Sequence, residues 1–74
     1  MKEDALIIRR DDWSDLIGAT VEIRLHGYPV LTGRVDHATA DSTILWLAQE
    51  GNNPRKIIDK AQNYEAWAVT ALLD

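Results

Sequence analysis

Residues 21–35 read VEIRLHGYPVLTGRV and carry the clearest structural signal in the chain. The first five alternate strictly between apolar and polar side chains, a period of two that is typical of a strand with one buried and one solvated face. Gly27 and Pro29 follow, and then a second β-rich run that contains Gly33. Turn residues between two such runs, and a glycine inside the second, predict a tight hairpin that leads into a bent strand. This arrangement favours a small β-barrel.

The remaining apolar runs predict five short strands in all. We expect them at residues 20–26, 30–38, 43–49, 56–61 and 65–72, with turns roughly every 8–12 residues, as in small barrels and sandwiches. The third of these strands is apolar on both faces, because Ile44 and Trp46 would point to one side and Leu45 and Leu47 to the other. Strands of this kind are usually covered on both faces. One face should therefore meet the core, and the other a helix or a second subunit.

A short amphipathic helix is expected before the first of these strands. Trp13, Leu16 and Ile17 are spaced i, i+3 and i+4, which places them on one helical face. Asp11 or Asp12 would cap the start of the helix, and the glycine at position 18 would end it. These signals predict a helix over residues 12–17. The sequence does not assign a secondary structure to residues 1–10, since the apolar run at positions 6–8 fits either a short strand or part of a leading helix.

Length and composition limit the classes of function. The chain has 74 residues, which indicates one domain over residues 1–74 with the barrel at 20–72. It has no cysteine, so disulfides and thiolate metal sites are excluded. Domains this small usually need extra stabilisation, and with 46% hydrophobic residues we expect it to come from assembly into a homo-oligomer. A net charge of −4 disfavours non-specific binding to DNA or to anionic membranes. No signal peptide or membrane span is visible, so we expect a cytoplasmic protein without a membrane partner.

The order of the elements and several short motifs resemble the Sm-like barrel of the Sm, LSm and Hfq proteins. LIGATVEI at residues 16–23 resembles the family's opening, where a helix end runs into the first strand. Gly33-Arg34-Val35 resembles the Gly-x-Val core of the first signature motif. Residues 43–47 fall where the family has its Asn-Leu-x-Leu element, and residues 59–67 fall at its second motif. The resemblance covers residues 12–69 and implies an all-β, five-stranded open barrel of Sm-like or SH3-like type with a short N-terminal helix.

The same resemblance implies a ligand and a mode of assembly. Sm-like proteins bind single-stranded RNA, and Thr43 stands where the family has its RNA-contacting Asn. Lys60 and Ala61 stand in place of the family's Arg-Gly pair. In such proteins the fourth strand of one subunit pairs with the fifth strand of the next. Here that pairing would join residues 56–61 to residues 65–69 of a neighbour.

Two sets of candidate residues follow. The candidates for nucleic-acid binding are Thr43, Lys60, Tyr64 and Arg55, which combine basic groups with an aromatic ring that could stack on a base. The candidates for an oligomer interface are Leu45, Leu47, Ile58 and Trp67. Ion pairs with neighbouring carboxylates on a solvated face would also explain the basic residues. The alternative function is therefore a protein-protein interaction or structural module that binds no nucleic acid.

Catalytic signals are missing from the sequence. There is no cysteine nucleophile, and Ser14 and Ser42 lack the Gly-x-Ser-x-Gly context of a serine hydrolase. The four glycines are scattered, so no phosphate-binding loop is present. His26 and His37 are the only histidines and show no metal-ligand spacing. We expect a non-enzymatic binding module with no catalytic residue, no metal and no cofactor.

Overall fold

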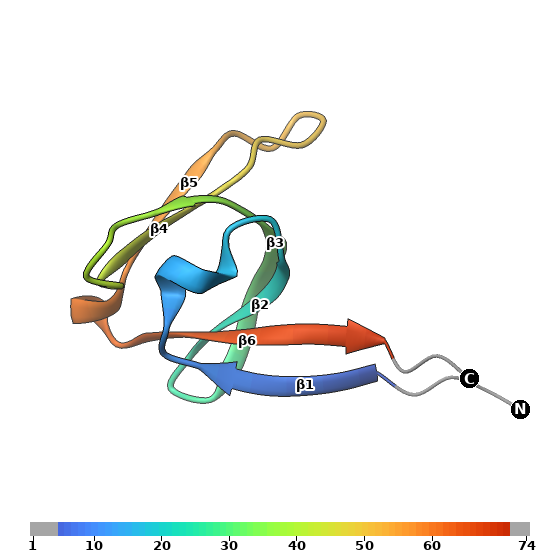
Figure 1. The fold of residues 1–74 in the computed structure, drawn as a ribbon. Coiled ribbons are helices and arrows are strands. Elements are labelled where there is room, and N and C mark those ends of the chain that lie inside the picture. Colours follow the sequence, from blue (N-terminus) through green and yellow to red (C-terminus); the bar gives the residue numbers. More distant parts are fainter. Residues whose placement is uncertain (1–4, 72–74) are drawn as a thin grey trace, which may run out of the picture.

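The computed structural model describes residues 5–71, which form one antiparallel β-sheet (Figure 1). Its strands are β1 (Ala5–Arg10), β2 (Thr20–Leu25), β3 (Tyr28–Ala38), β4 (Ile44–Leu47), β5 (Lys56–Asp59) and β6 (Tyr64–Ala71). Two 3-10 helices, η1 (Trp13–Leu16) and η2 (Lys60–Gln62), interrupt them. The strand order is β1-β6-β2-β3-β4-β5.

The predicted hairpin is confirmed by the β2–β3 pair. Leu25 lies opposite Tyr28, so His26 and Gly27 alone make the turn, and both have positive φ, at 54° and 83°. Two positive φ values in a two-residue loop match the right-handed twist of the flanking strands. On β2, Val21 and Ile23 are fully buried, as the alternating pattern predicts.

The long strand β3 bends between two partners. Its first half pairs with β2 and its second half with β4, with a register shift between Val35 and His37. Gly33 lies near this change of partner, and a Cβ atom there would stand 3.4 Å from the Leu47 side chain. That distance is an ordinary van der Waals contact, so lack of space does not require a glycine here. The bend of β3 at its change of partner agrees with the prediction.

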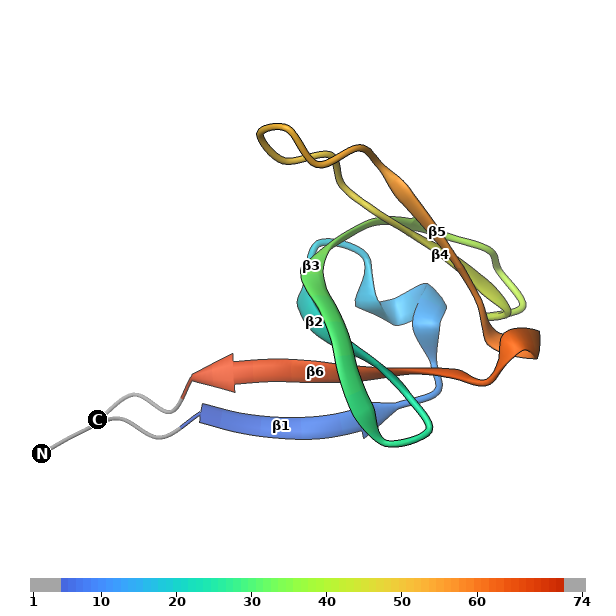
Figure 2. The ribbon, with the colours of Figure 1, turned by 180° about the vertical axis from the view of Figure 1, so that it is seen from behind.

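The predicted five-stranded open barrel differs from the observed sheet in its number of strands. An all-β fold is confirmed, but the sheet has six antiparallel strands and remains open, with β1 and β5 at its two edges (Figure 2). The extra strand is β1, which settles the alternative for residues 5–10 in favour of a strand. It pairs with β6 from Ala5↔Ala71 to Arg10↔Ala66. Because β6 pairs with β2 only as far as Ala68, β1 and β6 run on together as a two-stranded ribbon (Figure 1).

The helix predicted at residues 12–17 is a single 3-10 turn, and no α-helix occurs within the described residues 5–71. Asp12 makes no capping hydrogen bond and instead forms an ion pair with Arg10, while Ile17 already has an extended backbone with ψ 127°. A segment this short cannot repay the cost of starting an α-helix. Trp13 and Leu16 are nevertheless buried, whereas Ile17 is exposed.

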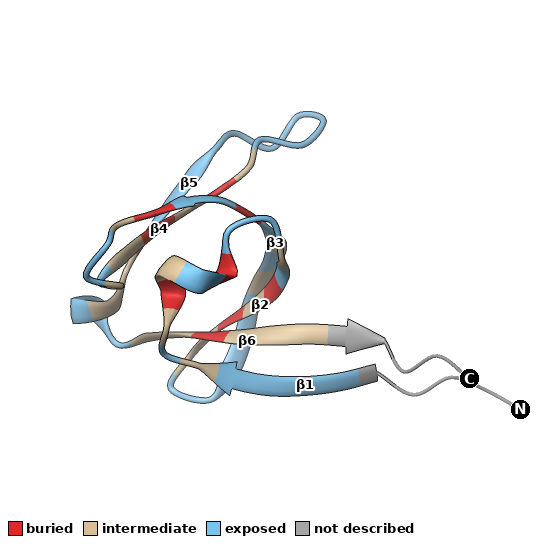
Figure 3. Ribbon diagram, in the orientation of Figure 1, coloured by how far each residue is buried: buried red, intermediate tan, exposed pale blue. Residues whose placement is uncertain are grey.

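The core fills the concave side of the bent sheet (Figure 3). Trp13 from η1 is its largest fully buried side chain, and Leu16, Val35, Leu45 and Ala66 pack with it. Strand β4 places Leu45 and Leu47 in this core, while Ile44 and Trp46 on its other face are half-buried. Within residues 5–71 no helix is long or apolar enough to cross a membrane.

Candidate interaction surfaces

Two of the four predicted nucleic-acid residues, Lys60 and Tyr64, line one polar cleft beside η2. The cleft has a volume of about 380 Å³ and is also lined by Arg9, His26, Asn63 and Glu65. A tight local turn builds it: the Asp59 carboxylate accepts a hydrogen bond of 2.9 Å from the Ala61 N–H, and Asn63 ends η2 in the left-handed conformation. The sequence predicted part of this cleft but missed Arg9, which β1 brings in by pairing with β6.

The basic groups of the cleft already have partners. Lys60 Nζ donates a hydrogen bond of 2.7 Å to the Asp11 carbonyl and lies 4.7 Å from the centre of the Trp13 ring. The Arg9 guanidinium lies 3.8 Å from a Glu65 carboxylate oxygen and 3.6 Å from an Asp11 carboxylate oxygen. These carboxylates reduce the attraction that the cleft can exert on a phosphate.

Thr43 lies outside the cleft, in the turn that joins β3 to β4. Its hydroxyl donates to the Asp41 carboxylate at 2.7 Å, and Thr39 donates to the same oxygen at 2.7 Å. These hydroxyl hydrogen bonds lower the pKa of Asp41, because they favour the ionised carboxylate. Only the backbone of Thr43 reaches the cleft region, where its carbonyl accepts a hydrogen bond of 2.9 Å from the Lys60 N–H.

Arg55 lies apart from the other three candidates, beyond the opposite end of β5. Its guanidinium pairs with Asp36 at 2.9 Å and stacks over the Trp46 ring, 5.5 Å from its centre. A similar arrangement lies elsewhere on the same non-core face of the sheet, where Arg24 pairs with Glu22 and lies 4.1 Å from the centre of the Trp67 ring. Arg55 thus has the carboxylate partner that the ion-pair interpretation of the basic residues expects, and Arg24 is paired within its own strand.

Three of the four predicted interface residues belong to the core. Leu45, Leu47 and Ile58 are 0%, 3% and 4% exposed within one chain, so they have almost no surface to offer to a second subunit. The fourth, Trp67, is half-buried; its Nε1–H donates to Glu65 at 3.0 Å, and Arg24 covers its ring. The sequence indicated correctly that β4 is apolar on both faces, but Trp46 is covered by Arg55 and by His37, whose ring centre lies 5.4 Å away.

The pairing of strands expected from the Sm-like resemblance is blocked in this structure. It requires a free edge on residues 65–69, but β2 pairs with β6 along one side from Tyr64 to Ala68. On the other side β1 pairs with β6 from Ala66 to Ala71. A neighbour could reach β6 only by displacing β1. The edges that remain for assembly in residues 5–71 are therefore the outer sides of β1 and β5 and the side of residues 28–33 of β3 that faces away from β2.

The longest run of exposed large apolar residues in the described part of the chain lies on β1. Leu6, Ile7 and Ile8 are 44%, 37% and 51% exposed, although they are consecutive and so point to both faces of the ribbon. Three adjacent exposed aliphatic residues on an edge strand form a surface that soluble proteins normally cover. Their apolar character is visible in the sequence, but their exposure follows from the projecting ribbon, which local pattern alone does not predict.

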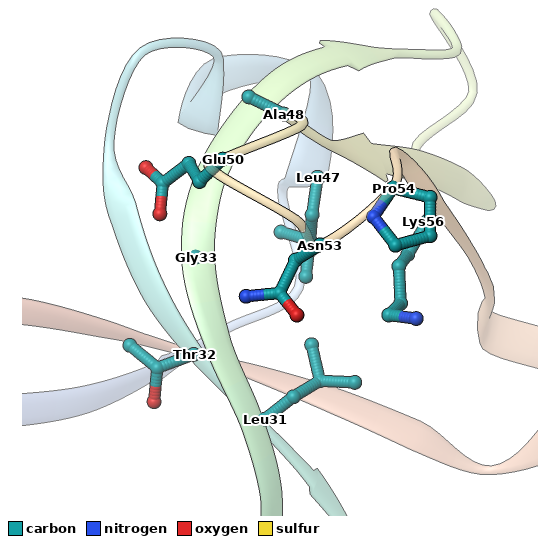
Figure 4. Close-up of a pocket in the computed structure, with 9 residues that line it drawn as sticks. All are labelled: Leu31, Thr32, Gly33, Leu47, Ala48, Glu50, Asn53, Pro54 and Lys56. Carbon is teal, nitrogen blue, oxygen red and sulfur yellow. The ribbon is translucent and has the colours of Figure 1, made fainter.

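A second, smaller cavity lies where β3 separates from β4 (Figure 4). Its volume is about 150 Å³, with Leu31, Gly33 and Leu47 as apolar lining and Glu50 and Lys56 as polar lining. This is smaller than the roughly 300–1,000 Å³ typical of small-molecule sites. A cavity of this size has room for about one side chain. In the described part of the chain, no group of three or more His, Cys, Asp or Glu residues could hold a metal ion.

Comparison with protein-family models, with curated proteins and with solved structures finds no match for this chain.

Proposed function

We propose that this protein is a non-enzymatic protein-interaction module that assembles with copies of itself. The observation that carries the proposal is the exposure of three consecutive aliphatic residues, Leu6, Ile7 and Ile8, on an edge strand. An edge strand offers backbone N–H and C=O groups to another chain, and its apolar side chains add the hydrophobic contribution to binding. A chain of 74 residues has little core with which to offset such exposure.

The distribution of charge favours a protein partner over a nucleic acid. Single-stranded nucleic acids bind grooves in which basic groups follow the backbone and aromatic rings stack on bases. Here Arg9, Arg24 and Arg55 each face a carboxylate, and the chain carries a net charge of −4. A polyanion would have to displace these internal partners.

We also propose that β2 to β6 correspond to the five strands of an Sm-like barrel. What supports it is that β2 to β6 coincide, in order, with the five strands predicted at residues 20–26, 30–38, 43–49, 56–61 and 65–72. In this interpretation β1 is an addition to a divergent, opened Sm-like barrel. The addition moves the assembly edge away from β6.

A second candidate function is the binding of single-stranded RNA in the polar cleft. The specific observation in its favour is that Lys60, Tyr64, Arg9 and His26 line one cavity of about 380 Å³. That arrangement would allow one base to stack on the tyrosine while a phosphate meets the lysine.

Two measurements distinguish these functions. Light scattering on the purified chain at micromolar concentration should give a mass above that of one 8.3 kDa chain; a monomeric mass over the whole range would refute the proposed function. Fluorescence anisotropy with labelled oligo-U and oligo-A at low salt should show no binding. Binding that Lys60→Ala abolishes and Arg55→Ala leaves intact would instead establish the second candidate, because only Lys60 lines the cleft.

A further inference from the structure

We propose that two copies of this chain join by antiparallel pairing of their β1 strands about a two-fold axis, with Ile7 opposite Ile7. The inference rests on the proposed self-association and adds to it the edge, the orientation and the register. The result would be one continuous sheet running through both copies, with the two β1 strands at its centre.

The geometry of β1 favours it over β5, the strand at the other end of the sheet. It is six residues long and pairs with β6 without a register shift, and none of its residues is proline. Natural edge strands avoid pairing through charge, proline, bulges or short length. Strand β5 has two of these protections, because it has only four residues and both of its end residues, Lys56 and Asp59, are charged. Strand β1 is charged only at one end, by Arg9 and Arg10, and its first four residues are uncharged.

Symmetry restricts the register. A two-fold axis perpendicular to an antiparallel pair relates a residue to its own equivalent, so the centre of the pairing must be a residue opposite itself. With Ile7 at the centre, Leu6 lies opposite Ile8 of the second copy on both sides of the axis. Directly opposite aliphatic residues contact one another across the strands, so all three exposed residues of β1 gain cover in one step.

The charges of the described strand are compatible with the same register. With Ile7 at the centre, Arg9 of one copy lies opposite Ala5 of the other, so the arginines of the two strands lie at opposite ends of the paired segment and do not face one another. Within each chain the Arg9 guanidinium lies near Asp11 and Glu65, and Arg10 pairs with Asp12.

Cross-linking tests the register directly, because the natural chain has no cysteine. Opposite Cα atoms in an antiparallel pair are about 4.5–5.5 Å apart, within the span of a disulfide. Under mild oxidation Ile7→Cys should become a covalent dimer on a non-reducing gel. Ile57→Cys is the matched control, since it places the same change on an exposed isoleucine of the other edge strand, β5. Dimer formation by Ile57→Cys alone would overturn the inference.

Dissociation provides the second measurement. Ile7→Lys should raise the dimer dissociation constant by about tenfold or more, because the two-fold axis places the two new ammonium groups opposite each other. Ile57→Lys should leave it unchanged, and circular dichroism would show that both variants fold. If Ile57→Lys dissociates the assembly and Ile7→Lys does not, the edge is wrong but self-association stands. If the natural chain is monomeric at every concentration, the proposed function itself fails.

Discussion

Replacing Trp13 with alanine removes the largest fully buried side chain of the core. This residue joins η1 to the sheet, because its ring packs among the buried residues and its Nε1–H donates to the Arg10 carbonyl at 3.1 Å. Truncating a buried tryptophan to alanine lowers the free energy of unfolding by about 3–5 kcal/mol. Losing the hydrogen bond costs about 1 kcal/mol, which either forms part of that loss or adds to it. We therefore expect Trp13→Ala to lower the free energy of unfolding by about 4–5 kcal/mol.

That loss is large compared with the stability of so small a domain. At about 0.05–0.15 kcal/mol per residue, the free energy of unfolding of a chain of 74 residues is about 4–11 kcal/mol. Trp13→Ala should accordingly leave much of the protein unfolded at 25 °C. Trp13→Phe keeps most of the ring but loses the hydrogen bond to Arg10, so it should cost about 1–2 kcal/mol.

The assay is urea unfolding followed by far-ultraviolet circular dichroism, which does not depend on tryptophan emission. Ile17→Ala is the matched control, because Ile17 closely follows η1 but is 51% exposed. It should change stability by no more than about 0.5 kcal/mol. A loss below about 1.5 kcal/mol for Trp13→Ala, or equal losses for the two variants, would refute the placement of η1 against the core.

Three further substitutions test local geometry. Asn63 has a left-handed backbone with φ 72°, so in urea unfolding Asn63→Ala should cost about 1 kcal/mol while Asn63→Gly costs little or nothing. The pKa of Asp41 is lowered by two neighbouring threonine hydroxyls, so its contribution to stability is present above about pH 4 and lost as the pH falls through the folded-state pKa. Thermal melting between pH 6 and pH 2 should therefore show a smaller drop for Asp41→Asn than for the natural chain. Gly33→Ala should change stability by no more than about 0.5 kcal/mol, because its Cβ would meet the Leu47 side chain at an acceptable 3.4 Å.

The parts of the fold that local pattern encodes could be predicted from the sequence. Alternation along β2 predicts which side chains are buried, and the glycine at position 27 predicts the turn, since both depend on neighbours in the chain. The helical spacing of Trp13 and Leu16 likewise identified two core residues. It did not show that the segment forms a 3-10 turn, because the same spacing suits either helix over one turn.

The candidate sites were harder to predict because they depend on long-range pairing. Arg9 reaches the polar cleft only because β1 pairs with β6, more than fifty positions later in the chain. Arg55 donates a hydrogen bond to Asp36, nineteen positions away, so its guanidinium is already paired and less available to a ligand. The Arg24–Glu22 pair, by contrast, could be predicted, because residues two apart on one strand share a face.

The placement of β1 explains both the failure of the expected ring pairing and the new candidate for assembly. Once β1 covers the outer side of β6, that strand has partners on both sides and offers no edge. The unpaired backbone groups at this end of the sheet therefore belong to β1, whose aliphatic side chains are exposed. Adding a strand to an open sheet moves its edge without removing it. Self-association through β1 would satisfy the new edge, whereas association through β6 would require the chain first to break the pairing of β1 with β6.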